Sequence, residues 1–417
     1  MSKEAKDLEE ESGDAFINQN EVGEVVEEVV DEDQPMSDDE DLDEDEFDEH
    51  GNLEIDLTNN SSTYFDQHQD SIFLISSHPT LPMVVTGGGD EMGYLWTTHS
   101  NPPRVASQLT GHTESLVAGG FTSDGKYLVT GDMNGQIRVW RSKAGGEKWE
   151  FFSSLQEVDE VVCLRIHPKQ PVFAISAKDG SIWVYEMGGN KLNNIAVLNA
   201  HSEAVNDLLF AEVDNEEKMT LISASDDAGI ISWNVYQSTA NYHLGPAQLK
   251  GEHPWVVLCL SPSGRTFATG SQDGTMVIVK VDDGALLQKI DTGNDAEDEE
   301  SRSVEAIAWA DKANIVAVGN VGGQIQLWDI ATWKVRNTLQ IEGAITKLEF
   351  IKGTTKLVSS GYDGSLIVWD VITGNKVWQC FGHNAGVLGF AIQENGSRII
   401  SAGDEGVSLV FEVSEVD

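Results

Sequence analysis

Short apolar runs recur along the chain from residue 57 onward, separated by turns rich in glycine, aspartate or asparagine. Four segments align without gaps, namely LVTGDMNGQIRVWR (128–141), LISASDDAGIISWN (221–234), VAVGNVGGQIQLWD (316–329) and LVSSGYDGSLIVWD (357–370). In each segment, a strand with small polar residues leads through a turn into a strand that ends on tryptophan. The pattern predicts a repeated antiparallel β-unit.

The repeat has a period in the forties, which is typical of a four-stranded unit. Strands that open a unit are predicted to start near Ser71, Ser115, Val161, Ala204, Pro254, Ser303, Ala344 and Gly386. Because eight such units follow one another, the sequence predicts an all-β protein built from eight four-stranded units.

Two dipeptides support this interpretation. Gly-His precedes an opening strand at 111–112 and 382–383, and Trp-Asp closes a third strand at 328–329 and 369–370. A unit of about 45 residues with these marks resembles the WD-repeat family. With eight units, this resemblance implies an eight-bladed WD-repeat β-propeller. The other blades carry degenerate forms of the two marks.

The two ends of the repeat region are predicted to meet. The eighth unit ends near Phe411 and has no fourth strand after it, whereas an unassigned strand-like run, 62–66, precedes the first unit. We expect this run to pair with the last blade, because closing the ring removes exposed sheet edges. The propeller is therefore expected to span 57–417.

Residues 1–56 form an acidic tail with 25 acids and only two bases, Lys3 and Lys6. Such a segment cannot bury enough apolar surface to offset its chain entropy, so we expect it to be disordered. Its role stays open between a solubilising tail and a docking site for a basic partner.

The whole chain is strongly acidic, with 26 Lys+Arg against 70 Asp+Glu and a net charge of −44. This composition excludes nucleic-acid binding through a basic surface, and it excludes attraction to an anionic membrane. No run of 18 apolar residues is present, so no membrane span is expected. The chain is expected to be a monomer.

Cysteine and histidine offer no catalytic or metal-binding pattern. Cys163, Cys259 and Cys380 lie far apart, which favours buried thiols in a reducing compartment, the cytoplasm or the nucleus. The histidines before opening strands (68, 112, 201, 253 and 383) match positions that the WD family uses to bond a turn aspartate and a tryptophan. We therefore expect no enzyme, no cofactor and no metal.

Charge is distributed unevenly over the predicted propeller. In a four-stranded meander, the loop into the first strand and the turn between strands two and three lie at one end, and we call this end the mouth face. It comprises 66–71, 110–116, 156–161, 200–205, 251–255, 291–305, 340–345 and 381–387, with the turns 89–93, 132–135, 177–180, 225–229, 272–274, 320–323, 362–364 and 404–406. These segments hold 26 acids and two bases, Arg302 and Lys178. Five of the acids (Asp90, Asp179, Asp227, Asp273 and Asp363) match a structural turn position.

The remaining acids favour a site for an extended basic peptide, since Lys and Arg form charge-assisted hydrogen bonds with carboxylates. Glu114, Glu160 and Glu305 flank the apolar residue that opens a strand, and Asp226 and Asp404 stand one residue before the position that the structural acids occupy. All five are predicted to point toward the centre of the ring.

Three aromatic residues have similar positions on the predicted blades. Phe73, Trp255 and Tyr362 could pack against the aliphatic stems of a ligand's Lys or Arg. A role in the core or at the rim explains each of them equally well.

Longer segments resemble one WD-repeat family in particular. The segments 57–73, 78–89 and 401–413 are similar to the Sqt-type family, whose animal relative is the angio-associated migratory cell protein. The resemblance implies a ribosome assembly chaperone that captures the basic N-terminal segment of large-subunit ribosomal protein L10 (uL16) and delivers it to the pre-60S subunit. The family's binding residues carry over onto Glu114, Glu160, Glu305 and Asp404, and Asp159 keeps an acidic pair with Glu160.

Two other functions remain open from the residues alone. A WD-repeat scaffold or substrate receptor, for example of a ubiquitin ligase, would need a second, apolar docking surface, and the sequence contains no helical docking segment. A histone chaperone would also use an acidic surface, because histone tails are basic and extended.

Overall fold

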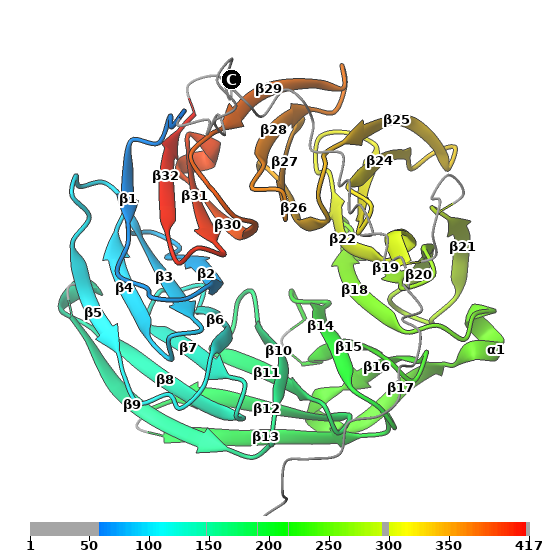
Figure 1. Ribbon diagram of the computed structural model, residues 1–417. Coiled ribbons are helices and arrows are strands. Elements are labelled where there is room, and N and C mark those ends of the chain that lie inside the picture. Colours follow the sequence, from blue (N-terminus) through cyan, green and yellow to red (C-terminus); the bar gives the residue numbers. More distant parts are fainter. Residues whose placement is uncertain (1–57, 147, 190, 216, 294–299, 414–417) are drawn as a thin grey trace, which may run out of the picture. The chain divides into compact units, whose positions relative to one another are not determined.

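The computed structural model describes residues 58–413, with gaps at 147, 190, 216 and 294–299. The acidic tail expected at 1–56 lies outside the described residues. The unit that begins at Leu57 consists of eight four-stranded antiparallel sheets, and Figure 1 shows them as the blades of a ring. The predicted eight-bladed propeller is confirmed.

Each blade has an innermost strand near the axis of the ring, followed outward by a second strand. The innermost strands are β2 (Ile72–Ser77), β6 (Leu116–Phe121), β10 (Val161–Ile166), β14 (Val205–Ala211), β18 (Trp255–Leu260), β22 (Val304–Trp309), β26 (Ile345–Phe350) and β30 (Val387–Gln393). The second strands are β3 (Met83–Gly88), β7 (Tyr127–Asp132), β11 (Val172–Ala177), β15 (Thr220–Ser225), β19 (Thr266–Ser271), β23 (Ile315–Asn320), β27 (Lys356–Gly361) and β31 (Arg398–Gly403). Every innermost strand begins within one residue of its predicted start.

Third and outer strands complete the blades. The third strands are β4 (Gly93–Thr97), β8 (Gln136–Lys143), β12 (Ser181–Gly188), β16 (Ile230–Asn234), β20 (Thr275–Lys280), β24 (Gln324–Asp329), β28 (Leu366–Asp370) and β32 (Ser408–Glu412). The outer strands are β5 (Val105–Leu109), β9 (Lys148–Gln156), β13 (Lys191–Asn199), β17 (Thr239–Leu244), β21 (Leu286–Asp291), β25 (Lys334–Gln340), β29 (Asn375–Cys380) and β1 (Thr63–Phe65). Helical turns are few: α1 (Pro246–Leu249), η2 (Ala144–Gly146), η3 (Val235–Gln237), η4 (Glu300–Arg302) and η5 (Glu394–Gly396). None of the helices in the described part of the chain could cross a lipid bilayer.

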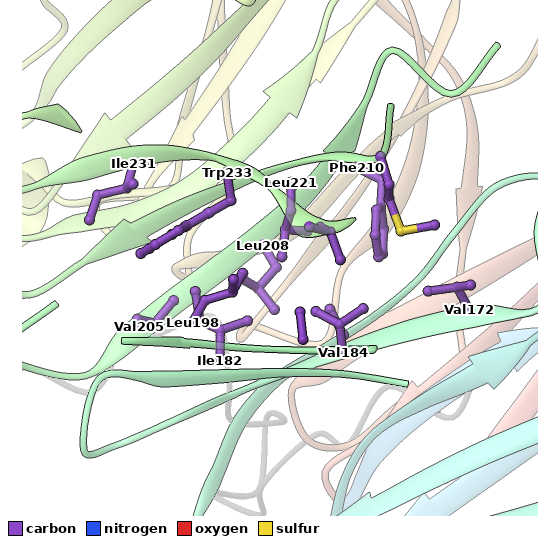
Figure 2. Close-up of a cluster of buried hydrophobic side chains, with 14 of the residues drawn as sticks. Val172, Ile182, Val184, Leu198, Val205, Leu208, Phe210, Leu221, Ile231 and Trp233 are labelled. Carbon is purple, nitrogen blue, oxygen red and sulfur yellow. The ribbon is translucent and has the colours of Figure 1, made fainter. Parts of the chain in front are cut away.

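The core lies between blades rather than within them. Second strands are buried on both faces, because each sheet packs against a neighbouring sheet on either side. Figure 2 shows one such interface, where Ile182 and Val184 of β12 face Leu208, Leu221 and their neighbours from the next blade. Comparable clusters occupy the other blade interfaces, including the one between the last and first blades. Burial of these apolar side chains is the main stabilising contribution to the ring.

The last blade is completed by the first strand of the unit. β1 pairs with β32 in the register Thr63 opposite Val410 and Phe65 opposite Ser408. Phe65 is 3% exposed and stacks on Trp96 of the first blade, with ring centroids 4.7 Å apart. The run at 62–66 therefore joins the beginning of the described propeller to its last blade and also packs the blade interface at the closure.

Candidate functional site

The strand register defines the mouth face. In every blade the first residue of the innermost strand lies opposite the last residue of the second strand, for example Val161 opposite Ala177 and Val387 opposite Gly403. The loop into the innermost strand and the turn after the second strand therefore lie at the same end of each blade. Within the described residues, the acidic segments identified in the sequence are thus gathered at one end of the ring.

A β-bulge follows the first residue of all eight innermost strands. It leaves the second residue unpaired, and a bulge of this kind re-aims the side chain that it carries. These bulge residues, none of which is fully buried, are Phe73, Val117, Val162, Asn206, Val256, Glu305, Thr346 and Leu388. The bulges therefore place a mainly apolar set of side chains, with Glu305 among them, at the mouth end of the innermost strands.

A second set of positions lies where the second strand ends and the turn begins. In seven blades the backbone N–H at this turn position donates to the carbonyl of the residue before the innermost strand, as Asp404 N does to Gly386 O at 2.8 Å. The eight turn positions are occupied by Gly89, Met133, Lys178, Asp226, Gln272, Val321, Tyr362 and Asp404. Asp226, Tyr362 and Asp404, chosen separately from the sequence, thus hold equivalent positions in three blades.

Asp404 and Tyr362 are brought together at the mouth face. The Tyr362 hydroxyl donates to Asp404 Oδ2 at 3.4 Å, and the Ser71 hydroxyl donates to Asp404 Oδ1 at 2.6 Å. Tyr362 is 58% exposed, so its ring is available to a ligand. Phe73, which is 44% exposed, follows Ser71 by two residues on the first blade. Blades seven and eight thus present a carboxylate hydrogen-bonded to one exposed aromatic ring, and blade one adds a second exposed ring, Phe73.

The other predicted carboxylates stand on separate blades. Glu305 accepts a hydrogen bond from the Ser303 hydroxyl at 2.7 Å. Asp226 is exposed and accepts from Asn206 Nδ2 at 2.6 Å, while the same amide group donates to the Trp255 carbonyl. These hydrogen bonds orient both carboxylates without burying them.

The two adjacent acids of blade three, Asp159 and Glu160, differ in their hydrogen-bond partners. Glu160 accepts a hydrogen bond from Lys178 Nζ at 2.9 Å, so one of the two bases of the mouth face neutralises it. Asp159 is exposed, as is Glu114 on the preceding blade, and no side-chain hydrogen bond of either is recorded within the described residues. Sequence counting could not find the Glu160–Lys178 contact, although Lys178 is one of only two bases in the mouth-face segments.

Trp255 belongs to the core. It is 1% exposed, and its indole N–H donates to the Ala228 carbonyl at 3.1 Å. As the first residue of β18 it precedes the bulge, whereas Phe73 is the second residue of β2 and therefore lies within it. Of the two roles that the sequence left open, Trp255 has the structural one, so it is not a candidate for partner contact.

The structural acids and histidines are arranged largely as expected. His201 Nδ1 lies 2.9 Å from Asp227, its Nε2 lies 2.8 Å from the Ser223 hydroxyl, and Trp233 Nε1 donates to the same hydroxyl at 2.9 Å. His68 and His112 make equivalent contacts in their blades, and His383 pairs with Glu405 in place of aspartate. These groups hold the turns and are not free to act on a ligand.

Blade five departs from this arrangement. His253 lies 3.7 Å from Asp273, and 58% of its side chain is exposed. The third strand of this blade has Val279 where five other blades have tryptophan, and the buried Thr269 hydroxyl has no hydrogen-bond partner. The hydrogen-bonded set predicted for His253 is therefore incomplete, since the His253–Asp273 distance exceeds that of a hydrogen bond and no indole N–H is present.

Burial and hydrogen bonding have opposite effects on the pKa of the turn acid Asp227. Burial alone would raise the pKa of Asp227, but hydrogen bonds and charge from His201, with the backbone N–H groups of Ser202 and Gly229, lower the pKa to about 2. Among the described residues, no cluster of three or more His, Cys, Asp or Glu side chains could hold a metal ion.

The chain resembles known proteins in sequence and in fold. A family model described as outer membrane protein assembly factor BamB matches residues 92–380. The angio-associated migratory cell protein of Homo sapiens is 26% identical over 366 residues, covering 86% of this chain and 81% of that protein. The crystal structure of Chaetomium thermophilum Sqt1 bound to the N-terminus of the ribosomal protein L10 has a TM-score of 0.77 and 26% identity, covering 85% of this chain and 100% of that one.

A stronger likeness extends over nearly the whole sequence. The ribosome assembly protein SQT1 of Saccharomyces cerevisiae is 37% identical over 405 residues, covering 92% of this chain and 91% of that protein. The crystal structure of Saccharomyces cerevisiae Sqt1 superposes with a TM-score of 0.82 at 38% identity, covering 86% of this chain and 100% of that one. The resemblance stated from the sequence is confirmed, and the chain belongs to the SQT1 family of WD-repeat propellers.

Proposed function

We propose that this protein is a ribosome assembly chaperone. It binds the basic N-terminal segment of newly made ribosomal protein L10 (uL16) on its mouth face and delivers it to the pre-60S subunit. The relative from Chaetomium thermophilum is bound to the N-terminus of the ribosomal protein L10, which supports this choice of ligand. A free ribosomal protein exposes Lys and Arg side chains that are meant for RNA, and an acidic surface masks them until RNA competes.

The observation that carries the proposal is the concentration of carboxylates on one face. Asp226 and Glu114 are exposed, while Glu305 and Asp404 are partly exposed and keep lone pairs free for a ligand. Arginine and lysine of an extended segment would form charge-assisted hydrogen bonds with these groups. The summed negative field would also speed the encounter, and both effects weaken with added salt.

Apolar contacts supplement the charges. The bulge residues include Phe73, Val117, Val162, Val256 and Leu388, and the exposed ring of Tyr362 stands beside Asp404. These surfaces suit the aliphatic stems of Lys and Arg or an apolar residue between them. A segment that alternates basic and apolar residues therefore fits this face better than a uniformly charged one.

A structural role rather than catalysis accounts for the histidines. His383 has a hydroxyl, Ser401, on one side and a carboxylate, Glu405, on the other, as a hydrolase would require. However, the Ser401 hydroxyl also accepts from Leu409 N at 3.0 Å and is buried, so a substrate has no path to it. We therefore propose a binding protein without catalytic activity.

A titration tests the function. A labelled peptide with the N-terminal sequence of ribosomal protein L10 is expected to bind the wild type, and Glu305→Lys or Asp404→Lys should weaken binding roughly tenfold or more. Asp214→Lys is the matched control, because Asp214 lies in the turn between β14 and β15 at the opposite end of its blade. Equal weakening by all three variants would contradict a site on the mouth face.

Purification of the protein from cells distinguishes the remaining alternatives. Ribosomal protein L10 is expected as the stoichiometric partner, and Asp404→Lys should lose it. Recovery of histones, or of the subunits of a ubiquitin ligase, in its place would favour the histone chaperone or the substrate receptor. We propose the cytoplasm as the site of action, in keeping with three thiols that are free rather than disulfide-bonded.

A further inference from the structure

Resting on the function proposed above, we propose that Lys178 is an internal competitor for Glu160. A basic ligand gains Glu160 only by displacing Lys178, so this contact weakens retention of the ligand and eases its release. The direct observation is the 2.9 Å contact between Lys178 Nζ and Glu160 Oε2 at the mouth face. The lysine of the protein itself therefore occupies the place that a basic side chain of the ligand would take.

The contact between Lys178 and Glu160 belongs to the mouth face because of where Lys178 lies. Among the eight turn positions, Lys178 is the one base, and the equivalent positions of blades four and eight carry Asp226 and Asp404. Glu160 immediately precedes β10 and Lys178 immediately follows β11, so the two residues flank the Val161–Ala177 pair at the mouth end. The contact thus lies on the same ring of positions as the proposed ligand contacts.

The backbone that carries Lys178 is fixed, whereas its side chain is free to move. Asp179 accepts hydrogen bonds from the backbone N–H and the hydroxyl of Ser181. Gly180 has φ +84°, and a Cβ there would lie 2.7 Å from the His201 carbonyl oxygen, so only glycine fits. The Lys178 side chain is 70% exposed, and an ion pair so open to water is weak. A ligand can therefore displace the ammonium group without disturbing the turn.

An arginine of the ligand would bind the Glu160 carboxylate better than Lys178 does. The guanidinium group binds a carboxylate with two parallel hydrogen bonds, whereas the lysine ammonium acts as a point charge. Asp159, next to Glu160, is exposed and offers a second carboxylate to either cation. The exchange replaces one ion pair with another, so blade three contributes less to affinity than its two acids suggest.

A double-mutant cycle tests this competition. The dissociation constant and the dissociation rate are measured by titration and by stopped flow for the labelled L10 N-terminal peptide, with the wild type, Lys178→Met, Glu160→Gln and the double variant. Methionine keeps the length of the side chain and removes its charge. Lys178→Met is expected to tighten binding roughly fivefold, mainly through slower dissociation.

The decisive result is how much Glu160→Gln raises the dissociation constant, first with Lys178 present and then in the Lys178→Met variant. Glu160→Gln should weaken binding about twofold while Lys178 is present and roughly tenfold once Lys178 is methionine, because only then does the ligand use Glu160 fully. Lys169→Met provides the charge-matched control, since Lys169 pairs with Asp214 at the opposite end of the blades, and it should leave the dissociation constant unchanged.

The outcomes separate the inference from the function on which it rests. If the wild type binds the peptide but Lys178→Met does not tighten binding, Lys178 is not a competitor. If Glu160→Gln costs the same in both backgrounds, Lys178 acts only through the general field, and the inference is again overturned. If neither the wild type nor Lys178→Met binds the peptide, the proposed function fails and the inference fails with it.

Discussion

The Ser71 hydroxyl donates a hydrogen bond to Asp404 Oδ1 at 2.6 Å, although 333 residues separate the two along the chain. Ser71 precedes the innermost strand of the first blade, and Asp404 begins the turn after the second strand of the last blade. One carboxylate therefore links the two blades that close the ring and also stands among the proposed ligand contacts. Stability and binding are coupled at this residue, and two conservative substitutions can separate them.

Asp404→Asn should weaken ligand binding while leaving the fold nearly intact. Asparagine keeps an oxygen that accepts from Ser71 but removes the charge that attracts a basic segment. We expect a roughly tenfold rise in the dissociation constant for the L10 N-terminal peptide and a change in unfolding free energy within about 0.5 kcal/mol. Peptide titration and urea unfolding measure the two quantities.

Ser71→Ala should have the opposite effect. It removes the hydrogen bond across the closure, which lowers the unfolding free energy by about 1 kcal/mol, and it leaves the charge of Asp404 in place. Binding should stay within about twofold of the wild type. If Ser71→Ala impaired binding as much as Asp404→Asn does, the hydrogen bond rather than the charge would control the site.

Removing the closing strand should open the ring. A variant that lacks residues 1–66 loses β1, which exposes the edge of β32 and uncovers Trp96 by removing Phe65. We expect a loss of at least about 3 kcal/mol and self-association through the free edge, measured by thermal unfolding and light scattering. A variant that lacks only residues 1–56 should match the wild type in both measurements. Equal stability of the two truncations would show that β1 does not hold the ring.

The sequence was sufficient to predict the blades because their period is set by many residues at once. Each unit repeats a buried strand, a turn with a positive-φ position and an aromatic third strand, so one degenerate mark does not hide the others. Blade five lacks the tryptophan and has an exposed His253, yet its innermost strand begins at Trp255, one residue from the predicted start. Because each blade has several repeat marks, its strands could be predicted even where one mark is missing. The contacts of His253, which depend on that missing mark, could not.

The exposure and the contacts of single side chains could not be predicted in this way, because they depend on a strand register that the sequence does not specify. Trp255 and Phe73 stand one position apart in equivalent strands, and the bulge between these positions decides that the first is buried and the second is exposed. In an apolar run such as WVVLCL (255–260), no alternation of polar residues marks the two faces. Likewise, a count of charges treats Glu160 and Lys178 as independent, whereas their contact depends on two turns that meet in space.

Replacing Asp207 should lower the free energy of unfolding more than replacing its partner Arg165. The Asp207 side chain is 4% exposed and accepts from Arg165 Nη2 at 2.7 Å and from Leu258 N at 2.8 Å, which links β14 to the innermost strands of both neighbouring blades. Asp207→Ala leaves these donors unsatisfied, and we expect a loss of roughly 3 kcal/mol. Arg165→Met should cost about 1 kcal/mol, because the arginine is half exposed and the two backbone donors to Asp207 remain. Chemical unfolding of both variants gives the ranking, and a reversed order would contradict this role of Asp207.

Acid unfolding should depend on Asp227. Its pKa in the folded protein is about 2, below its ordinary value of 3.8, because hydrogen bonds from His201 and two backbone N–H groups outweigh the opposing effect of burial. A carboxyl whose folded pKa is depressed stabilises the fold above its unfolded pKa, and this contribution is lost as pH falls through the folded value. Between about pH 4 and pH 2, the wild type should therefore lose roughly 2 kcal/mol that Asp227→Asn, already less stable at neutral pH, does not lose. Unfolding free energies measured across this range test the difference, and parallel curves for the two proteins would show that the carboxylate is not linked to stability in this way.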